Sequence, residues 1–279
     1  MSPQARRAGC EFPSMKCDLI SPGNKKSLAL HRREICAVGR WLLEHGYIVS
    51  TEGNISVRLS GDRVLTSPAG CSKGWMSPSH LVVTDLEGRR ISGNHTPSSE
   101  LAMHLLIYRL RPEVNAVCHA HPVVATGFAA AAEPLNKAIL CEMVVALGTV
   151  PLARYGTPGT PELAAALEPL VPHYDAILMS NHGVVTYGTD LLSAFHRMEL
   201  VEHYAHVSLV AAMLGKQSLL SSGDVEKLLA ARPRYGVTVP EPDDTDVLVV
   251  ASEPEPALSR QGGHSRGHDQ DDDPEDPKR

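Results

Sequence analysis

Apolar residues recur along this chain with two different periods, which predict helices alternating with short strands. Between Ser27 and His45 they return every three or four positions, so we expect a core-facing helix that stops at Gly46. Helices are also expected over 124–132, 161–170 (capped by Thr160), 191–214 and 223–232. Short apolar or alternating runs predict strands at 55–59, 64–66, 81–85, 115–118, 150–152 and 176–179.

Three polar turns in this pattern are candidate anion-binding segments. The segment 96–100, Thr-Pro-Ser-Ser-Glu, precedes a further apolar periodic stretch and therefore predicts a helix N-terminus. Hydroxyls and free backbone N–H groups at such a position suit a phosphate, whereas Glu100 there is equally explained by the helix dipole. The Gly-Asn turn at 51–54 and the Gly70 turn suit an anion or a plain hairpin.

Chain length and composition indicate one domain with two tails. The chain has 279 residues, of which 43% are hydrophobic, and no sharp linker interrupts residues 28–240. We expect a catalytic domain over 27–239. Residues 1–26 lack periodicity and predict a flexible N-terminal extension, and residues 240–279, rich in Pro, Asp and Glu, predict a disordered acidic tail.

Charge and cysteine usage exclude several classes of partner. The formal net charge is −6 and the basic residues are scattered, so nucleic acid is not expected as a partner. No apolar run approaches 18 residues, which excludes a membrane span, and no secretory signal is apparent. The six cysteines form no Cys-x-x-Cys pair and are expected to be reduced thiols in a cytoplasmic protein.

The sequence contains a candidate metal site built from histidines. His119 and His121 follow a predicted strand, and alternation places their side chains on one face. A third ligand is available in His182, at a Gly turn after the strand 176–179. Three imidazoles leave a coordination position open, as in a catalytic zinc site rather than a structural one. A chance His-x-His pair among the 14 histidines is the alternative.

Other ionisable residues are less informative. Glu142 lies among apolar neighbours, where desolvation would raise its pKa and suit it to proton transfer, but an exposed position explains it equally well. His203 and His206 are expected on the surface of the 191–214 helix rather than at a metal.

Four motifs in a fixed order resemble the class II aldolase/adducin family over about residues 28–239. They are Gly-Asn-Ile-Ser at 53–56, Pro-Ser-Ser-Glu at 97–100, His-x-His at 119–121 and Asn-His-Gly at 181–183. The resemblance implies an α/β fold, a three-layer α/β/α sandwich with a largely antiparallel central sheet. It also implies a homotetramer with active sites at the subunit interfaces.

The resemblance further implies roles for individual residues. Zn²⁺, or another divalent cation such as Mn²⁺, would be held by His119, His121 and His182. A sugar-phosphate substrate would place its phosphate at Thr51, Asn54, Gly70, Ser98 and Ser99. Glu100 would transfer protons, and Tyr235 would reach into a neighbouring subunit's site.

The chain departs from the family pattern at two positions. Ala69 stands where the aldolases have a hydroxyl residue, and Glu142 stands where a catalytic tyrosine is expected. The expected activity is retro-aldol cleavage of a ketose 1-phosphate, of the fuculose-phosphate or 5-deoxyribulose-phosphate type, to dihydroxyacetone phosphate and an aldehyde. The alternatives are dehydration of methylthioribulose 1-phosphate, epimerisation or decarboxylation of a pentose phosphate, and a non-enzymatic interaction module like the adducin head.

Overall fold

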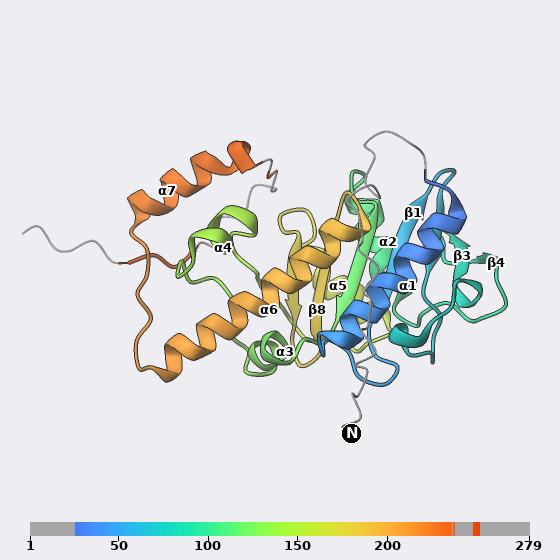
Figure 1. Ribbon diagram of the computed structural model, residues 1–279, viewed down its shortest axis with the longest axis horizontal. Coiled ribbons are helices and arrows are strands. Elements are labelled where there is room, and N and C mark those ends of the chain that lie inside the picture. Colours follow the sequence, from blue (N-terminus) through green and yellow to red (C-terminus); the bar gives the residue numbers. More distant parts are fainter. Residues whose placement is uncertain (1–25, 236, 238–247, 252–279) are drawn as a thin grey trace, which may run out of the picture.

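The computed structural model describes residues 26–235, 237 and 248–251 (Figure 1). Its helices are α1 (Leu28–Glu44), α2 (Leu101–Leu110), α3 (Val123–Ala130), α4 (Cys141–Ala146), α5 (Pro161–Leu167), α6 (Leu191–Met213) and α7 (Ser222–Ala231). Three 3₁₀ turns are described as well, η2 (Lys73–Trp75), η3 (Pro78–His80) and η4 (Arg232–Tyr235). Both the predicted N-terminal extension, except Lys26, and most of the predicted tail lie outside the described residues.

The described strands form one eight-stranded sheet in the order β4-β3-β2-β1-β5-β8-β7-β6. They are β1 (Asn54–Leu59), β2 (Arg63–Thr66), β3 (Val82–Asp85), β4 (Arg90–Ser92), β5 (Ala116–Ala120), β6 (Leu152–Ala153), β7 (Ala176–Met179) and β8 (Gly183–Gly188). Only the edge pair β6–β7 is parallel, and all other neighbours are antiparallel. The predicted largely antiparallel sheet is confirmed.

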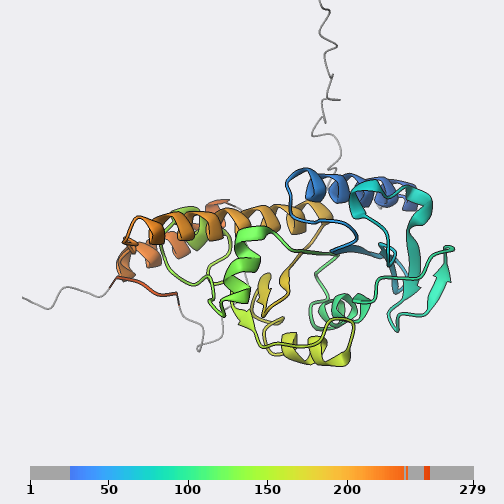
Figure 2. The same ribbon diagram turned by 90° about the horizontal axis from the view of Figure 1, so that it is seen from below.

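Helices cover both faces of this sheet, so the predicted three layers are confirmed (Figure 2). Because strand side chains alternate, each strand contributes to both cores. In β5, Cys118 faces the core shared with α1, α3 and α6, whereas Val117 faces the core shared with α2 and α5. The strands are therefore apolar on both sides, and a buried polar residue on them needs a partner.

Helix starts follow the local sequence closely. The Ser27 hydroxyl accepts a hydrogen bond from the backbone N–H of Leu30 at the start of α1, and the Thr160 hydroxyl accepts one from Glu162 at the start of α5. At α2 the expected serine cap is absent. Glu100 takes the cap position without a side-chain capping bond, and the Ser98 hydroxyl accepts from the N–H of Glu100.

A short segment near the C-terminus differs from the expected disordered tail. Residues 248–251 pair with the main body, where Ala138 N–H donates to Val249 O at 2.9 Å and Ala251 N–H donates to Leu220 O at 2.9 Å. Leu248 and Val250 pack on the small cluster of Ala138, Val144 and Val225. Residues 248–251 are apolar, unlike the acidic sequence around them, and the partial burial of Leu248 and Val250 explains this contact with the main body.

None of the helices in the described part of the chain combines the length and apolarity that crossing a membrane requires.

Candidate metal centre

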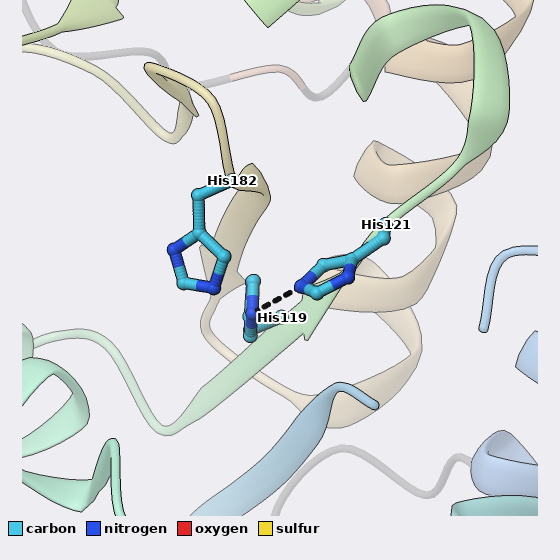
Figure 3. A group of neighbouring side chains, drawn as sticks. All are labelled: His119, His121 and His182. Atoms are coloured by element: carbon cyan, nitrogen blue, oxygen red, sulfur yellow. Dashed lines mark hydrogen bonds between the residues drawn. The ribbon is translucent and has the colours of Figure 1, made fainter. Parts of the chain in front are cut away.

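The three predicted histidines converge at one end of the central strands (Figure 3). His119 lies in β5, His121 follows its last residue, and His182 lies in the turn between β7 and β8. One ring nitrogen of each histidine lies within 4.8 Å of those of the other two. The ring centroids are 4.7–5.1 Å apart, so the side chains face a common point.

Strand pairing explains why His182 reaches the pair. β5 and β8 are antiparallel neighbours, and Ala120 is opposite Val184. The turn before β8 contains Asn181 with a φ of 54°, a conformation that Asn tolerates better than most residues. A Cβ atom on Gly183 would lie 2.5 Å from His121 Cδ2 and 2.7 Å from Ala120 O, so only glycine permits this approach.

The hydrogen bonds of the rings prepare two of them for a cation. His119 Nδ1 lies 2.9 Å from the carbonyl of Val184, and His121 Nδ1 lies 3.5 Å from the Glu52 carboxylate. Both neighbours are acceptors, which places the N–H on Nδ1 and leaves the two Nε2 lone pairs facing each other at 3.1 Å. Two lone pairs repel at this distance, and a shared cation removes the repulsion. The donor set therefore fits a divalent metal ion.

Burial keeps these imidazoles neutral, which metal binding requires. It lowers the pKa of His119 well below its ordinary value, and the neighbouring imidazoles act in the same direction. Burial, with a further contribution from His121, lowers the pKa of His182 to about 4. The pKa of His121 is lowered by burial too, although Glu52 opposes the shift.

Glu100 lies directly beside the histidines. Its Oε1 is 3.2 Å from His182 Nε2, and its Oε2 is 3.3 Å from His119 Nε2. Burial raises the pKa of this carboxyl group, while the hydrogen bond from Asn54 and the charge of Lys73 lower it. A carboxyl group with a raised pKa beside a metal site is suited to proton transfer.

The predicted phosphate-binding loops are adjacent to one another. Ser98 N–H donates to Ser67 O at 3.2 Å, and Ala69 N–H donates to Thr96 O at 3.0 Å, which joins the Gly70 loop to the start of α2. Gly70 is exposed with a φ of 66°. Thr51 and Ser99 are exposed as well, and Ser98 is half-buried.

Lys73 was missed by the sequence analysis although it joins two of these loops. Its Nζ donates to Thr51 O and to Cys71 O, each at 2.7 Å, and the residue is 2% exposed. Burial lowers the pKa of its ammonium group. No periodicity signals this lysine, because it lies in the short turn η2 rather than on a regular helix or strand.

Asn54 has a different environment from the other predicted phosphate residues. It is 2% exposed, and its Nδ2 donates to Glu100 Oε2 at 2.7 Å. Its Oδ1 accepts from His104 Nε2, so the amide is engaged with the protein interior. His104 was not predicted, although its position four residues after Glu100 places both on one face of a helix.

The remaining two predicted catalytic residues lie on the surface of the single chain. Glu142 is exposed in the first turn of α4, because the apolar residues after it, Met143 to Val145, face inward in its place. Of the two positions expected for Glu142, desolvated or exposed, the single chain therefore has the exposed one. Tyr235, the last residue of η4, is 70% exposed. His203 and His206 are exposed on α6 as expected.

Comparison with known proteins agrees with this geometry. Residues 33–209 match the family described as class II aldolase and adducin N-terminal domain. The chain is 34% identical over 212 residues to 5-deoxy-D-ribulose 1-phosphate aldolase of Bacillus thuringiensis serovar kurstaki, covering 75% of this chain and 98% of the relative. It is 36% identical over 176 residues to 3-oxo-tetronate 4-phosphate decarboxylase of Haemophilus influenzae, covering 60% and 81%. A solved L-fuculose 1-phosphate aldolase has a TM-score of 0.67 and 32% identity, covering 71% and 94%.

Proposed function

Because the chain belongs to the class II aldolase and adducin N-terminal domain family, we propose that it is a metal-dependent lyase acting on a ketose 1-phosphate. The reaction is retro-aldol cleavage to dihydroxyacetone phosphate and an aldehyde. The substrate is of the 5-deoxyribulose-phosphate or fuculose-phosphate type, as in two similar proteins. One observation carries the proposal, the buried Glu100 carboxylate within 3.3 Å of two of the three clustered histidines.

His119, His121 and His182 would hold the cation, Zn²⁺ or another divalent ion such as Mn²⁺. When bound, this ion supplies a Lewis acid that polarises the substrate carbonyl and stabilises the negative charge that develops during cleavage. The three ligands are neutral, so the positive charge of the ion is not cancelled by the protein.

Glu100 would move the protons. Cleavage between C3 and C4 needs a base for the C4 hydroxyl proton and an acid that returns a proton to C3. The raised pKa of Glu100 and its place beside the histidines support both roles. Glu142 and Tyr235 would assist from a neighbouring subunit, because both are exposed on the single chain.

The substrate phosphate would be bound by Thr51, Gly70, Ser98 and Ser99. Their backbone N–H groups and hydroxyls lie on adjacent loops, and Lys73 adds a positive charge beside them. The Asn54 amide would not bind the phosphate by itself, because it already binds Glu100 and His104; Asn54 would support the site through these two contacts. Fixing the phosphate here would orient the reacting carbons toward the histidines.

Assembly as a homotetramer with active sites at the interfaces is part of the proposal. The exposure of large side chains, 79% for Trp75 and 70% for Tyr235, supports burial against another copy. Sedimentation equilibrium tests this, and a monomer at micromolar concentration would contradict it.

The test of the activity is a panel of ketose and ketopentose phosphates incubated with metal-loaded protein. We expect dihydroxyacetone phosphate, detected by a coupled reductase, together with an aldehyde identified by mass. Products of unchanged carbon skeleton would instead indicate epimerisation, or dehydration as for methylthioribulose 1-phosphate. Absence of both bound metal and turnover would favour a non-enzymatic interaction module.

Decarboxylation of a 3-oxo-tetronate 4-phosphate is the second candidate function. It is supported by the 36% identity to the Haemophilus influenzae decarboxylase. Loss of CO₂ from a 3-oxo acid also builds up negative charge beside a carbonyl, so the same histidines and carboxylate suit it. Because loss of CO₂ from this substrate also leaves dihydroxyacetone phosphate, release of CO₂ in place of an aldehyde would select this reaction.

A further inference from the structure

A chain of buried side chains runs from Glu100 into the core between the sheet and α2. Asn54 Nδ2 lies 2.7 Å from Glu100 Oε2, and Asn54 Oδ1 contacts His104 Nε2. His104 Nδ1 lies 2.7 Å from Ser56 Oγ, which lies 2.8 Å from Tyr108 OH. Ser56, His104 and Tyr108 are at most 1% exposed, so solvent plays no part in these contacts.

The direction of each hydrogen bond between these buried side chains follows from which atoms can donate and which can only accept. An amide oxygen only accepts, so His104 Nε2 carries a proton and donates it to Asn54 Oδ1. Burial lowers the pKa of His104 to about 3, so the ring is neutral and Nδ1 is an acceptor. Ser56 therefore donates to His104, and Tyr108 donates to Ser56.

This direction determines how Asn54 faces Glu100. With its oxygen bound by His104, the amide presents Nδ2 to the carboxylate and binds Oε2. A reversed amide would place its oxygen against the carboxylate and its NH₂ group against a ring N–H, which is repulsive at both ends. Glu100 Oε1 has no hydrogen-bond partner among the described residues, so Asn54 alone of them holds the carboxylate by a hydrogen bond.

The position of His104 is unusual for a core residue. Its neighbours on α2, from Met103 to Ile107, are buried and apolar apart from His104 itself. An imidazole buried completely costs free energy unless both nitrogens are satisfied. Here both are satisfied, and the series of hydrogen bonds ends on the Glu100 carboxylate, which lies within 3.3 Å of His119 and His182.

We propose that His104 is a positioning residue, which orients the Asn54 amide so that it holds the Glu100 carboxylate beside His119 and His182. This inference rests on the proposed function insofar as Glu100 transfers protons there. The hydrogen bonds of His104 go to Asn54 and Ser56 and not to the histidine cluster, so His104 acts on Glu100 through Asn54.

Two substitutions at one position separate this role from simple core packing. Gln carries an N–H donor and an acceptor at the end of its side chain, whereas Phe fills the space without either. For His104→Phe we expect kcat to fall by about 10–100-fold, with KM and bound metal changed by less than about threefold. His104→Gln recovers most of the lost kcat.

Leu105→Ala is the matched control, since Leu105 is buried on the same helix at 5% exposure and belongs to the apolar core. It lowers stability as a core truncation does but leaves kcat near the wild-type value. Equal kcat losses in His104→Phe and His104→Gln, or a loss in Leu105→Ala as large as that in His104→Phe, would overturn the inference.

A structural measurement decides the inference even if the wild-type protein turns over no substrate in the panel, an outcome that counts against the proposed function alone. In a crystal structure of His104→Phe, we expect the Asn54 amide to be turned or displaced and the Glu100 carboxylate to have left Asn54 Nδ2. The His104→Gln structure should retain the bond. Glu100 in its original place in His104→Phe would refute the positioning role.

Discussion

At the scale of single residues, burial and hydrogen bonding prepare groups for chemistry that their sequence neighbours do not reveal. The histidines of the cluster are neutral because they are buried, and Glu100 is more easily protonated for the same reason. The site therefore combines neutral imidazoles with a carboxyl group whose pKa is raised.

Replacing one ligand tests the metal assignment. His121→Ala removes one of three imidazoles, so we expect bound metal and turnover to be lost while the far-ultraviolet circular dichroism is unchanged. Metal content is measured by mass spectrometry after purification without chelator. The control His203→Ala removes an exposed histidine of α6 and leaves metal content as in the wild type. Unchanged metal in His121→Ala would show that the ligand assignment is wrong.

Replacing Glu100 tests the proton-transfer assignment. Glu100→Gln retains the shape of the side chain and its hydrogen bonding but cannot exchange a proton. We expect metal to be retained and turnover to fall by about 10²–10⁴-fold. If Glu142→Gln alone caused such a loss, the main acid/base role would belong to Glu142, and the dehydratase alternative would gain support.

The buried imidazole of His104 makes stability depend on pH. Its pKa is about 3 in the folded chain, against an ordinary pKa of 6.5 for an exposed histidine. Between these values the unfolded chain binds a proton that the folded chain does not, so stability is full above pH 6.5 and falls as the pH is lowered. The slope of this contribution approaches ~1.4 kcal/mol per pH unit.

Urea denaturation at pH 7 and pH 5 measures this contribution. We expect the wild type to lose more stability between the two values than His104→Gln, whose side chain does not titrate. The histidine ligands titrate in both proteins, so their effect cancels in the difference. Equal losses would mean that His104 is protonated in the folded state.

At the scale of elements, the site depends on the close approach of strand β8 to the end of strand β5. β8 starts at Gly183, which lies against the His121 ring, and β5 ends at Ala120, the residue before His121. Helix α3 starts at Val123, two residues after His121. In its first turn the N–H groups of Val124 and Ala125 donate to the Glu202 carboxylate of α6 at 3.0 and 2.8 Å. These contacts leave little freedom to the segment that carries His121.

A methyl group added at Gly183, where β8 lies against the His121 ring, should disturb the metal site. In Gly183→Ala the new Cβ would lie 2.5 Å from His121 Cδ2, so the ring or the strand must move. We expect the dissociation constant for Zn²⁺ to rise by at least about tenfold. The control Gly127→Ala, on α3, places its Cβ where no atom beyond its chain neighbours and its own helix backbone lies within 4 Å, and it leaves metal affinity unchanged. Titration with a competing chelator measures both variants.

At the scale of the whole molecule, the metal would connect parts of the chain that are distant in sequence. His119 and His182 are brought together by the β5–β8 pairing, and a bound ion links the same two segments a second time. A ligand that binds only the folded state stabilises it by mass action.

Removing the metal should therefore lower thermal stability. At a free Zn²⁺ concentration of about 100 times Kd, the stabilisation amounts to ~2.7 kcal/mol. We expect a chelator to lower the melting temperature of the wild type, and added Zn²⁺ to restore it. The same treatment of His121→Ala should leave its melting temperature unchanged. A chelator effect of equal size in both proteins would mean that the metal binds elsewhere.

The amino-acid sequence by itself determined the local features of this protein. Helix and strand positions follow from hydrophobic periods, which depend only on neighbours a few residues away, and α1, β7 and α6 lie within two residues of their predicted ends. The orientation of His119 and His121 to one side has the same local origin. Strand β8 was not predicted, because its Gly-flanked sequence carries no clear alternation.

Only the tertiary structure decided which distant groups meet. The order of strands in the sheet brought His182 to the histidine pair. Packing of α2 on the sheet joined Asn54 to Glu100 and His104, and packing of α4 through Met143, Val144 and Val145 left Glu142 in solvent. Such contacts depend on pairing and packing between segments tens of residues apart. Hydrophobic periodicity specifies which face of an element is buried, but not which other element covers it.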